Sequence, residues 1–316
     1  MGLFANSLTA CFTICLGLGS GTDVAVAASA PAALEVRVIR VGDVELHYVE
    51  KGKGIPVIFV HGSVDDYRSF EPQLEPLSQR YRVIAYSRRY NFPNARVAPR
   101  ANHSAQVEAE DLAGLLKALG AYPAHVVGHS YGAYTALILA MNHPELVRSV
   151  VLAEPPLLRW LPGLPGGQRL YSDFMNSMWD PTGREFRQGN AEKAMRITFD
   201  WFGRNGYLID GKPARFDALP AETRDFVMQN ALEWQALTTS ADPFPMLERA
   251  DVSAVKVPVL LMSGTNTMPM NKRIDEELKK LLPNAETVVI RDATHEMWAE
   301  RPDECRARVA AFFAKH

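Results

Sequence analysis

The stretch Gly128-His129-Ser130-Tyr131-Gly132 decides the fold, because a Gly-x-Ser-x-Gly pentapeptide here joins two contrasting runs. A short apolar run typical of a buried strand precedes it, and an alanine-rich run typical of a helix follows it. A serine on such a sharp strand-to-helix turn is held out of the sheet, and flanking glycines let strand and helix pack closely. The helix N-terminus then directs backbone N–H groups at a reacting carbonyl. The pattern predicts that Ser130 is a nucleophile, and the alternative is a tight turn with an incidental serine.

The composition is that of a globular α/β protein. The chain has 316 residues, 47% of them hydrophobic, and a formal net charge of -2, which suits one large domain with an insertion. The near-neutral charge argues against a nucleic-acid partner, since a phosphate-binding face needs a basic excess. The sequence has no Cys-x-x-Cys pair and no His-Glu-x-x-His motif, so we predict no metal site.

Residues 1–30 differ from the rest of the chain and resemble a secretory signal peptide. Residues 8–18 are mostly apolar, and both Ala25-Val26-Ala27 and Ala28-Ser29-Ala30 resemble small-residue cleavage sites. This predicts export to the periplasm or the medium. The start of the chain lacks the usual Lys or Arg. The alternatives are therefore a misassigned start codon or a disordered leader, and a cytoplasmic location. The apolar run is too short for a stable membrane span.

The pattern after the leader is that of a mostly parallel, doubly wound sheet. Residues 34–39 and 44–49 alternate apolar and polar around Gly42-Asp43, which predicts a β-hairpin. The other predicted elements are strands over 56–60, 81–86, 125–127, 147–153, 257–262 and 287–290, and helices over 70–77, 104–119, 274–282 and 302–314. Strands and helices that alternate in this way place helices on both faces of the sheet.

Residues 157–248 interrupt this alternation and are predicted to form a helical cap. They hold four of the five tryptophans and favour short helices, for example over 220–237. The core would then comprise residues 31–156 and 249–316, with the cap over the carboxyl ends of the strands, where ligands bind. The cap composition predicts a largely apolar pocket; the alternative is that its large side chains only bury the cap on the core. The candidate pocket residues are Trp179, Trp201, Phe202, Met228 and Trp234.

A serine hydroxyl needs a base within hydrogen-bonding reach, and His295 is the best candidate. It follows the last predicted strand, where a loop can bring its imidazole over Ser130. The alternative is a solvent-exposed loop histidine. The other seven histidines flank strands, turns or the terminus, and His103, at the start of a predicted helix, is expected at the surface.

The base needs a carboxylate that orients it, and we assign this role to Glu154. No acid follows the strand over 257–262 until Asp275, which already belongs to the next helix. Glu154 ends the strand directly after the nucleophile strand, so a parallel sheet places it beside the Ser130 turn. The alternatives are that Glu154 pairs with Arg159 or a backbone amide, and that Asp292 is the acid instead.

Two backbone N–H groups should stabilise the oxyanion. One is that of Tyr131, the residue after the nucleophile, and the other is that of Ser63, in the His61-Gly62-Ser63 loop after the first buried strand. The segment Tyr86–Asn91 follows a strand at the same rim, and Arg88 and Arg89 within it could be solvated or paired with acids.

Together, His61-Gly62, the Ser130 pentapeptide, the late His295 and the helical insert resemble the α/β-hydrolase superfamily over about residues 35–316. The chain departs from the common pattern in having no Asp after the strand over 257–262. A subset that includes haloalkane dehalogenases and zearalenone lactone hydrolases places its acid after the earlier strand, at a spacing similar to that of Glu154. The dehalogenases and epoxide hydrolases use Asp as nucleophile, where this chain has Ser130. The resemblance implies a serine esterase or lactonase without a cofactor.

We therefore expect hydrolysis of an ester or lactone of a largely apolar small molecule through an acyl-enzyme. The same three residues would also suit cleavage of an amide or a C–C bond, or acyl transfer. A different alternative is a non-catalytic small-molecule receptor of the same fold, and a further one is cofactor-free oxygenation in a related pocket.

Overall fold

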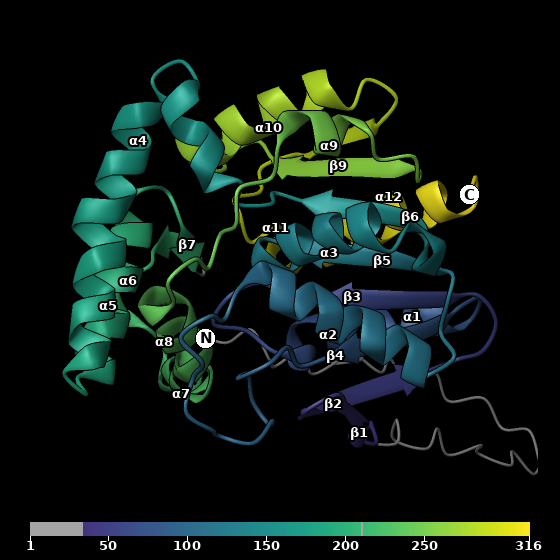
Figure 1. Cartoon of the computed structure of the whole chain (residues 1–316), viewed down its shortest axis with the longest axis horizontal. Helices are drawn as coiled ribbons and strands as arrows, with labels where there is room; N and C mark the ends of the chain where they lie inside the picture. The colour runs from purple at the N-terminus through teal and green to yellow at the C-terminus, as the bar shows by residue number, and fades with distance from the viewer. Residues whose placement is uncertain (1–33, 210) are drawn as a thin grey trace, which may run out of the picture. The chain divides into compact units, whose positions relative to one another are not determined.

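Within the described residues, 34–209 and 211–316, a mixed eight-stranded sheet carries the fold (Figure 1). The computed structural model gives the strand order β1-β2-β4-β3-β5-β6-β9-β10, with β2 antiparallel to both neighbours and the other pairs parallel. The predictions made for residues 1–30 lie outside the described residues. The strands are β1 (Arg37–Val41), β2 (Val44–Lys51), β3 (Pro56–Val60), β4 (Arg82–Tyr86), β5 (Ala124–His129), β6 (Val147–Ala153), β9 (Val259–Gly264) and β10 (Glu286–Ile290).

The central strands are buried on both faces, which explains their predominantly apolar sequences. Every residue of β5 and β9 is buried, as are all but the first of β3. Helices α2 and α3 pack together on one face, and α1 and α12 on the other (Figure 1). The predicted α/β fold with a mostly parallel sheet is confirmed. The helices of this part are α1 (Glu71–Ser78), α2 (Ala105–Ala118), α3 (Tyr131–Asn142), α9 (Arg249–Ser253), α10 (Pro269–Leu281), α11 (Met297–Glu300) and α12 (Pro302–Phe313).

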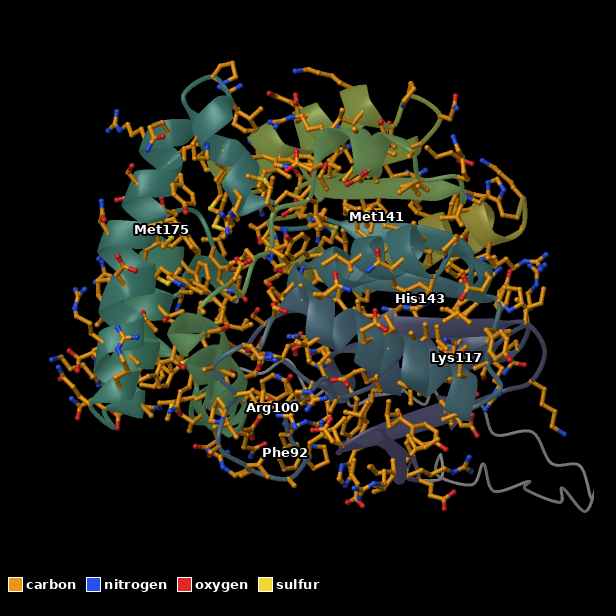
Figure 2. All side chains as sticks on the ribbon, in the orientation of Figure 1. Phe92, Arg100, Lys117, Met141, His143 and Met175 are labelled. Carbon is orange, nitrogen blue, oxygen red and sulfur yellow. The ribbon has the colours of Figure 1, made fainter. Side chains whose placement is uncertain are left out.

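The segment between β6 and β9 is mainly helical, as expected. Its helices are α4 (Gly167–Phe174), which runs through a π-helical turn at Met175–Trp179 into α5 (Asp180–Arg187), then α6 (Ala191–Arg204), α7 (Ala221–Gln229) and α8 (Ala231–Thr239). We call this helical segment the cap. Its helices gather at one end of the sheet (Figure 1). Side chains occupy the space between the cap and the sheet (Figure 2). Residues 35–316, cap included, form one compact unit.

Two details of the cap differ from the prediction. The helix expected over 220–237 is broken at Asn230, whose side chain donates to Asp66 Oδ2 (2.8 Å) and accepts from Phe92 N (2.8 Å). A long-range tie to the core thus ends α7. A two-stranded hairpin, β7 (Leu208–Ile209) and β8 (Lys212–Pro213), was not expected, because strands of two residues show no periodicity.

Two further features concern membrane-spanning helices and the cysteine Cys305. Among the described residues, no helix combines the length and the apolar character that a membrane crossing requires. Cys305 is buried, and burial raises the pKa of its thiol to about 12.

Candidate active site

Ser130 occupies the turn between β5 and α3 in a conformation that few non-glycine residues adopt. Its φ is 51° and its ψ is -122°. The turn is tied to the end of β6 by a hydrogen bond from Ser130 N to Ala153 O (2.8 Å). A Cβ atom at Gly132 would lie 2.1 Å from Val60 O, and one at Gly128 would lie 2.4 Å from Ala133 Cα. Only glycines therefore allow helix and strand to meet closely enough to form this turn.

His295 and Glu154 lie in direct contact. His295 Nδ1 is 2.5 Å from Glu154 Oε2, and Glu154 is almost fully buried. Strands β6 and β9 are neighbours, and β10 pairs with β9, so the residues that follow them meet at one edge of the sheet. Of the alternatives for Glu154, a bond to a backbone amide does occur alongside the contact with His295, and the pairing with Arg159 does not. Arg159 pairs with Asp242 (2.9 Å), and Asp292 is exposed.

His295 also lies beside the residue before the predicted nucleophile. The imidazole centroids of His129 and His295 are 4.7 Å apart, and His129 Nε2 donates to His295 O at 2.9 Å. Within the described residues, no hydrogen bond joins Ser130 Oγ to His295. Catalytic hydrogen bonds of this kind are often long without substrate and tighten when it binds. The structure thus brings His295, Glu154 and the Ser130 turn together while leaving that last bond unmade.

Glu154 is held by donors that the sequence did not point to. Gly264 N donates to Oε1 (2.9 Å), and Thr267 Oγ1 (2.5 Å) and Asn271 Nδ2 (2.8 Å) donate to Oε2. Gly264 ends β9, Thr267 lies in the loop that follows, and Asn271 lies in the first turn of α10. The available signal was the polar run Ser263-Gly264-Thr265-Asn266-Thr267 directly after a buried strand. We call Gly264, Thr267 and Asn271 the acid cradle.

The acid cradle and the contact between Glu154 and His295 determine the protonation states of these two residues. Burial raises the pKa of Glu154, but its bonds to His295, Thr267 and Gly264 outweigh burial and hold the pKa below the usual value. Burial lowers the pKa of His295, but the hydrogen bond and charge of Glu154 outweigh it, so the pKa is raised. An ionised Glu154 accepts the Nδ1–H, which leaves Nε2 as the free nitrogen of the neutral ring.

The two predicted oxyanion donors are available. Tyr131 begins α3, so its N–H has no partner within the helix. Within residues 34–209 and 211–316, neither Tyr131 N nor Ser63 N donates to another group. The Ser63 loop closely approaches the nucleophile, since a Cβ atom at Gly62 would lie 3.3 Å from Ser130 Cβ.

The predicted pocket residues lie mostly in the interior of the cap. Trp179, Trp201 and Trp234 are buried, and the rings of Trp179 and Trp234 meet edge to face at 5.2 Å. Phe202 stacks on Tyr207 at 5.5 Å, and Met228 is partly buried. Tyr207 is the cap ring near the candidate base, 6.5 Å from the His295 ring. Sequence reasoning missed it, because an irregular segment carries no pattern.

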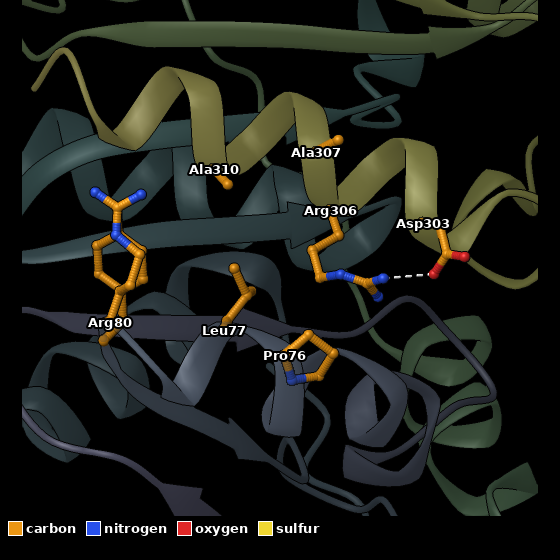
Figure 3. A pocket seen from close by; sticks show the side chains of 8 residues that line it. Pro76, Leu77, Arg80, Asp303, Arg306, Ala307 and Ala310 are labelled. Carbon is orange, nitrogen blue, oxygen red and sulfur yellow. Dashed lines mark hydrogen bonds and ion pairs between the residues drawn. The ribbon is translucent and has the colours of Figure 1, made fainter.

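A small hollow is lined in part by Trp201, one of the predicted pocket residues, and a larger hollow lies away from all of them. The larger hollow, of about 290 Å³, lies at the surface between α1 and α12 (Figure 3). Its walls include Leu77 and Arg80 on one side and Arg306, paired with Asp303, on the other. It shares no residue with the Ser130 turn.

The arginines at the rim are paired with acids. Arg88 is fully buried between Glu108 and Glu233, and Arg89 donates to both oxygens of Asp111 at 2.7 Å. The expectation of a surface role for His103 was wrong. Its ring is buried, 3.1 Å from Glu108, because the start of α2 packs under the cap connection.

One group of side chains offers ligand atoms to a cation. Atoms of His129, His295 and Glu296 lie within 4.8 Å of one another. His129 Nε2 already donates to a carbonyl and His295 Nδ1 to Glu154. A metal here would take the remaining nitrogen of His295, the one that a base needs.

The fold agrees with the comparisons with known proteins. The family model described as the alpha/beta hydrolase fold matches residues 55–302. The chain belongs to the α/β-hydrolase family and is a hydrolase of that fold.

Individual proteins match this chain at low sequence identity or over only part of its length. The 2-(acetamidomethylene)succinate hydrolase of Mesorhizobium japonicum is 36% identical over 118 residues, 37% of this chain and 42% of that protein. Carboxylesterase CesB (YbfK) from Bacillus subtilis has a similar structure (TM-score 0.70, 19% identity, 90% of this chain and 93% of that one). Est816, an N-acyl homoserine lactone degrading enzyme, also has a similar structure (TM-score 0.68, 21% identity). The match covers 87% of this chain and 100% of Est816. At these identities the two structures show a shared fold.

Proposed function

We propose that this chain is a serine hydrolase that cleaves a carboxylic ester or lactone of a largely apolar small molecule. The observation that carries the proposal is the 2.5 Å contact of His295 Nδ1 with Glu154 Oε2 beside the strained Ser130 turn. A buried acid that fixes the Nδ1–H tautomer leaves Nε2 free to take a hydroxyl proton. Names of proteins with the same fold, a carboxylesterase and a lactone-degrading enzyme, agree with this substrate class.

In the proposed reaction, Ser130 Oγ attacks the acyl carbonyl while His295 Nε2 takes its proton. The N–H groups of Ser63 and Tyr131 stabilise the oxyanion, and removal of one such donor typically costs about 3 kcal/mol of transition-state stabilisation. His295 then protonates the leaving alcohol. Water, activated by the same imidazole, hydrolyses the acyl-enzyme. Glu154 stays ionised and stabilises the imidazolium in both steps.

Covalent labelling and ester turnover test this proposal. A fluorophosphonate probe should label the wild-type chain at Ser130 and leave Ser130→Ala unlabelled. The wild type should hydrolyse p-nitrophenyl esters or lactones. A chain that binds apolar ligands without labelling and without ester turnover would instead be a receptor, and the proposal would fail.

The acid assignment has its own test. Glu154→Gln should keep the fold and lower kcat by about 10³- to 10⁴-fold, because the amide favours the wrong tautomer. Asp292→Asn, at an exposed position, is the matched control and should keep wild-type kcat. Full activity of Glu154→Gln together with an inactive Asp292→Asn would reassign the acid.

A second candidate is amide hydrolysis on the same residues. The observation that favours it is the 36% identity, over 118 residues, with a hydrolase of 2-(acetamidomethylene)succinate. A panel of esters, lactones and acetamido compounds separates the two. Turnover confined to the acetamido compounds would favour this second candidate.

A further inference from the structure

A buried cluster of charges joins the cap to the core close to the proposed oxyanion site. Arg88 follows β4, Glu108 lies on α2, and Glu233 lies on the cap helix α8. Their side chains are at most 1% exposed. Arg88 Nη2 is 2.9 Å from Glu233 Oε1, and Nη1 bonds Glu108. A single guanidinium therefore holds one carboxylate from the core and one from the cap.

The pair of Arg88 and Glu233 also holds the backbone on both sides of Ser63. Before it, Arg88 Nε donates to His61 O (3.0 Å) and Nη2 donates to Gly62 O (2.9 Å). After it, Val64 N donates to Glu233 Oε2 (3.0 Å). Val64 has a φ of 59°, an unfavourable conformation for a β-branched residue that persists only when its surroundings impose it.

The same guanidinium contacts the second proposed donor residue. Arg88 Cζ lies 5.1 Å from the centre of the Tyr131 ring, within the range of a cation–π contact. Tyr131 is further anchored by its hydroxyl, which donates to Pro243 O at 2.7 Å. Arg88 therefore contacts both segments whose N–H groups would surround the oxyanion.

The cost of the cluster indicates a role beyond linking cap to core. Two carboxylates share one guanidinium, and burial raises the pKa of Glu233 even though Arg88 opposes that rise. Apolar residues of similar volume would link the two parts at least as well, because buried ion pairs gain little net stability. An apolar side chain could not accept the Val64 N–H.

We infer that Arg88 and Glu233 are positioning residues that fix the Ser63 loop for oxyanion stabilisation, so that the cap completes the oxyanion site. The inference rests on the proposed serine-hydrolase function. It assigns Glu233 no contact with substrate. It predicts that a change at Glu233 acts on the transition state and leaves substrate binding largely intact.

The decisive variant is Glu233→Gln, which keeps the shape but cannot accept from both Arg88 and Val64 N. We expect kcat on an activated ester to fall about 10- to 100-fold with KM within about 3-fold, as a displaced oxyanion donor requires. The affinity for a trifluoromethyl ketone, which forms a tetrahedral adduct, should fall by the same factor as kcat. Ala236→Gly, buried on the same helix, is the control for a loosened cap and should keep both values.

The outcomes separate this inference from the function on which it rests. If the wild type takes up no fluorophosphonate at Ser130 and cleaves no ester, the proposed function fails first. If the wild type is labelled and active while Glu233→Gln keeps kcat and ketone affinity, only the positioning role fails. An equal loss in Ala236→Gly would also overturn it. Should Glu233→Gln not fold, Glu233→Asp keeps the charge with a shorter reach and should show the same selective loss of kcat.

Discussion

At the scale of single residues, the contact between His295 and Glu154 determines how the site responds to pH. The acid cradle keeps Glu154 ionised, and Glu154 raises the pKa of the His295 ring despite its burial. Glu154 therefore stabilises the form of His295 that has already accepted a proton. This is the form that a general base reaches in the transition state.

The first prediction concerns the pH dependence of kcat/KM. A base must start neutral, so kcat/KM should rise with pH through a value above 6.5, the usual pKa of histidine. In Glu154→Gln the residual activity should rise at lower pH, because burial then acts on the ring without the carboxylate. Ester assays from about pH 5 to about pH 9 measure the rising limb of kcat/KM for the wild type and for the variant. A wild-type limb at or below 6.5, unchanged in the variant, would contradict this account.

The raised pKa of His295 also makes the stability of the fold depend on pH. Because the folded-state pKa of His295 is raised, its contribution to stability is complete below the unfolded-state pKa. That contribution is lost as the pH rises through the folded-state pKa.

The second prediction concerns Asp275, a buried acid that the proposed reaction does not use. Burial, and then the charge of Glu154, raise its pKa to about 8. Between about pH 4 and about pH 8 the unfolded chain has released this proton and the folded chain has not, so stability falls as the pH rises. Asp275→Asn should raise the free energy of unfolding by roughly 1–3 kcal/mol at about pH 8 and by little at about pH 4. Urea denaturation at both pH values measures this difference in the free energy of unfolding. An equal effect of the substitution at both pH values would refute the raised pKa of Asp275.

At the scale of elements, the serine turn depends on how closely α3 meets β3. The Cβ of an alanine at Gly132 would collide with Val60 O and His61 O, both backbone atoms that cannot move away. The turn geometry is therefore a property of two strands and a helix together.

The third prediction follows from this contact. Gly132→Ala should lower the free energy of unfolding by about 3 kcal/mol or more and abolish fluorophosphonate labelling. Gly163→Ala is the control, because a Cβ there would meet only the far end of Arg249 at 3.9 Å. Thermal unfolding and probe labelling of the two variants give the comparison. A labelled, stable Gly132→Ala would show that the turn can relax.

The elements also show what sequence can and cannot predict. The limits of β3 and β6 were predicted to the residue, since predominantly apolar runs are local signals. The assignment of Glu154 as the partner of His295 rested on its place at the end of the strand after the nucleophile strand, and on the lack of an acid after the strand over 257–262. The polar run over 263–267 was the one sequence signal for the acid cradle, and the break at Asn230 had none, because both depend on side chains from distant segments. The pair of Arg88 and Glu233 spans 145 residues of sequence, and no local pattern records it.

At the scale of the whole molecule, cap and core share buried charge, so they should unfold together. Arg88 neutralises carboxylates on both, and its removal leaves two acids buried without their cation. Breaking a buried ion pair on one side is strongly destabilising.

The fourth prediction tests this coupling. Arg88→Met should lower the free energy of unfolding by about 3–5 kcal/mol. Arg159→Met, which removes an exposed pair with Asp242, should change it by less than about 1 kcal/mol. Tryptophan fluorescence, mainly from the cap, and far-ultraviolet circular dichroism should give one coincident wild-type transition. Two separate transitions would show that the parts unfold independently.

The Glu233 contact also bears on how the specificity of this hydrolase can be redesigned. Exchanging cap segments between homologues is an obvious way to obtain new substrate preferences. A donor segment without an acid at the position of Glu233 would leave Val64 N and one face of Arg88 without their acceptor. Such a chimera would receive a new binding surface and a misaligned reaction centre at once, so the graft must carry this glutamate with it.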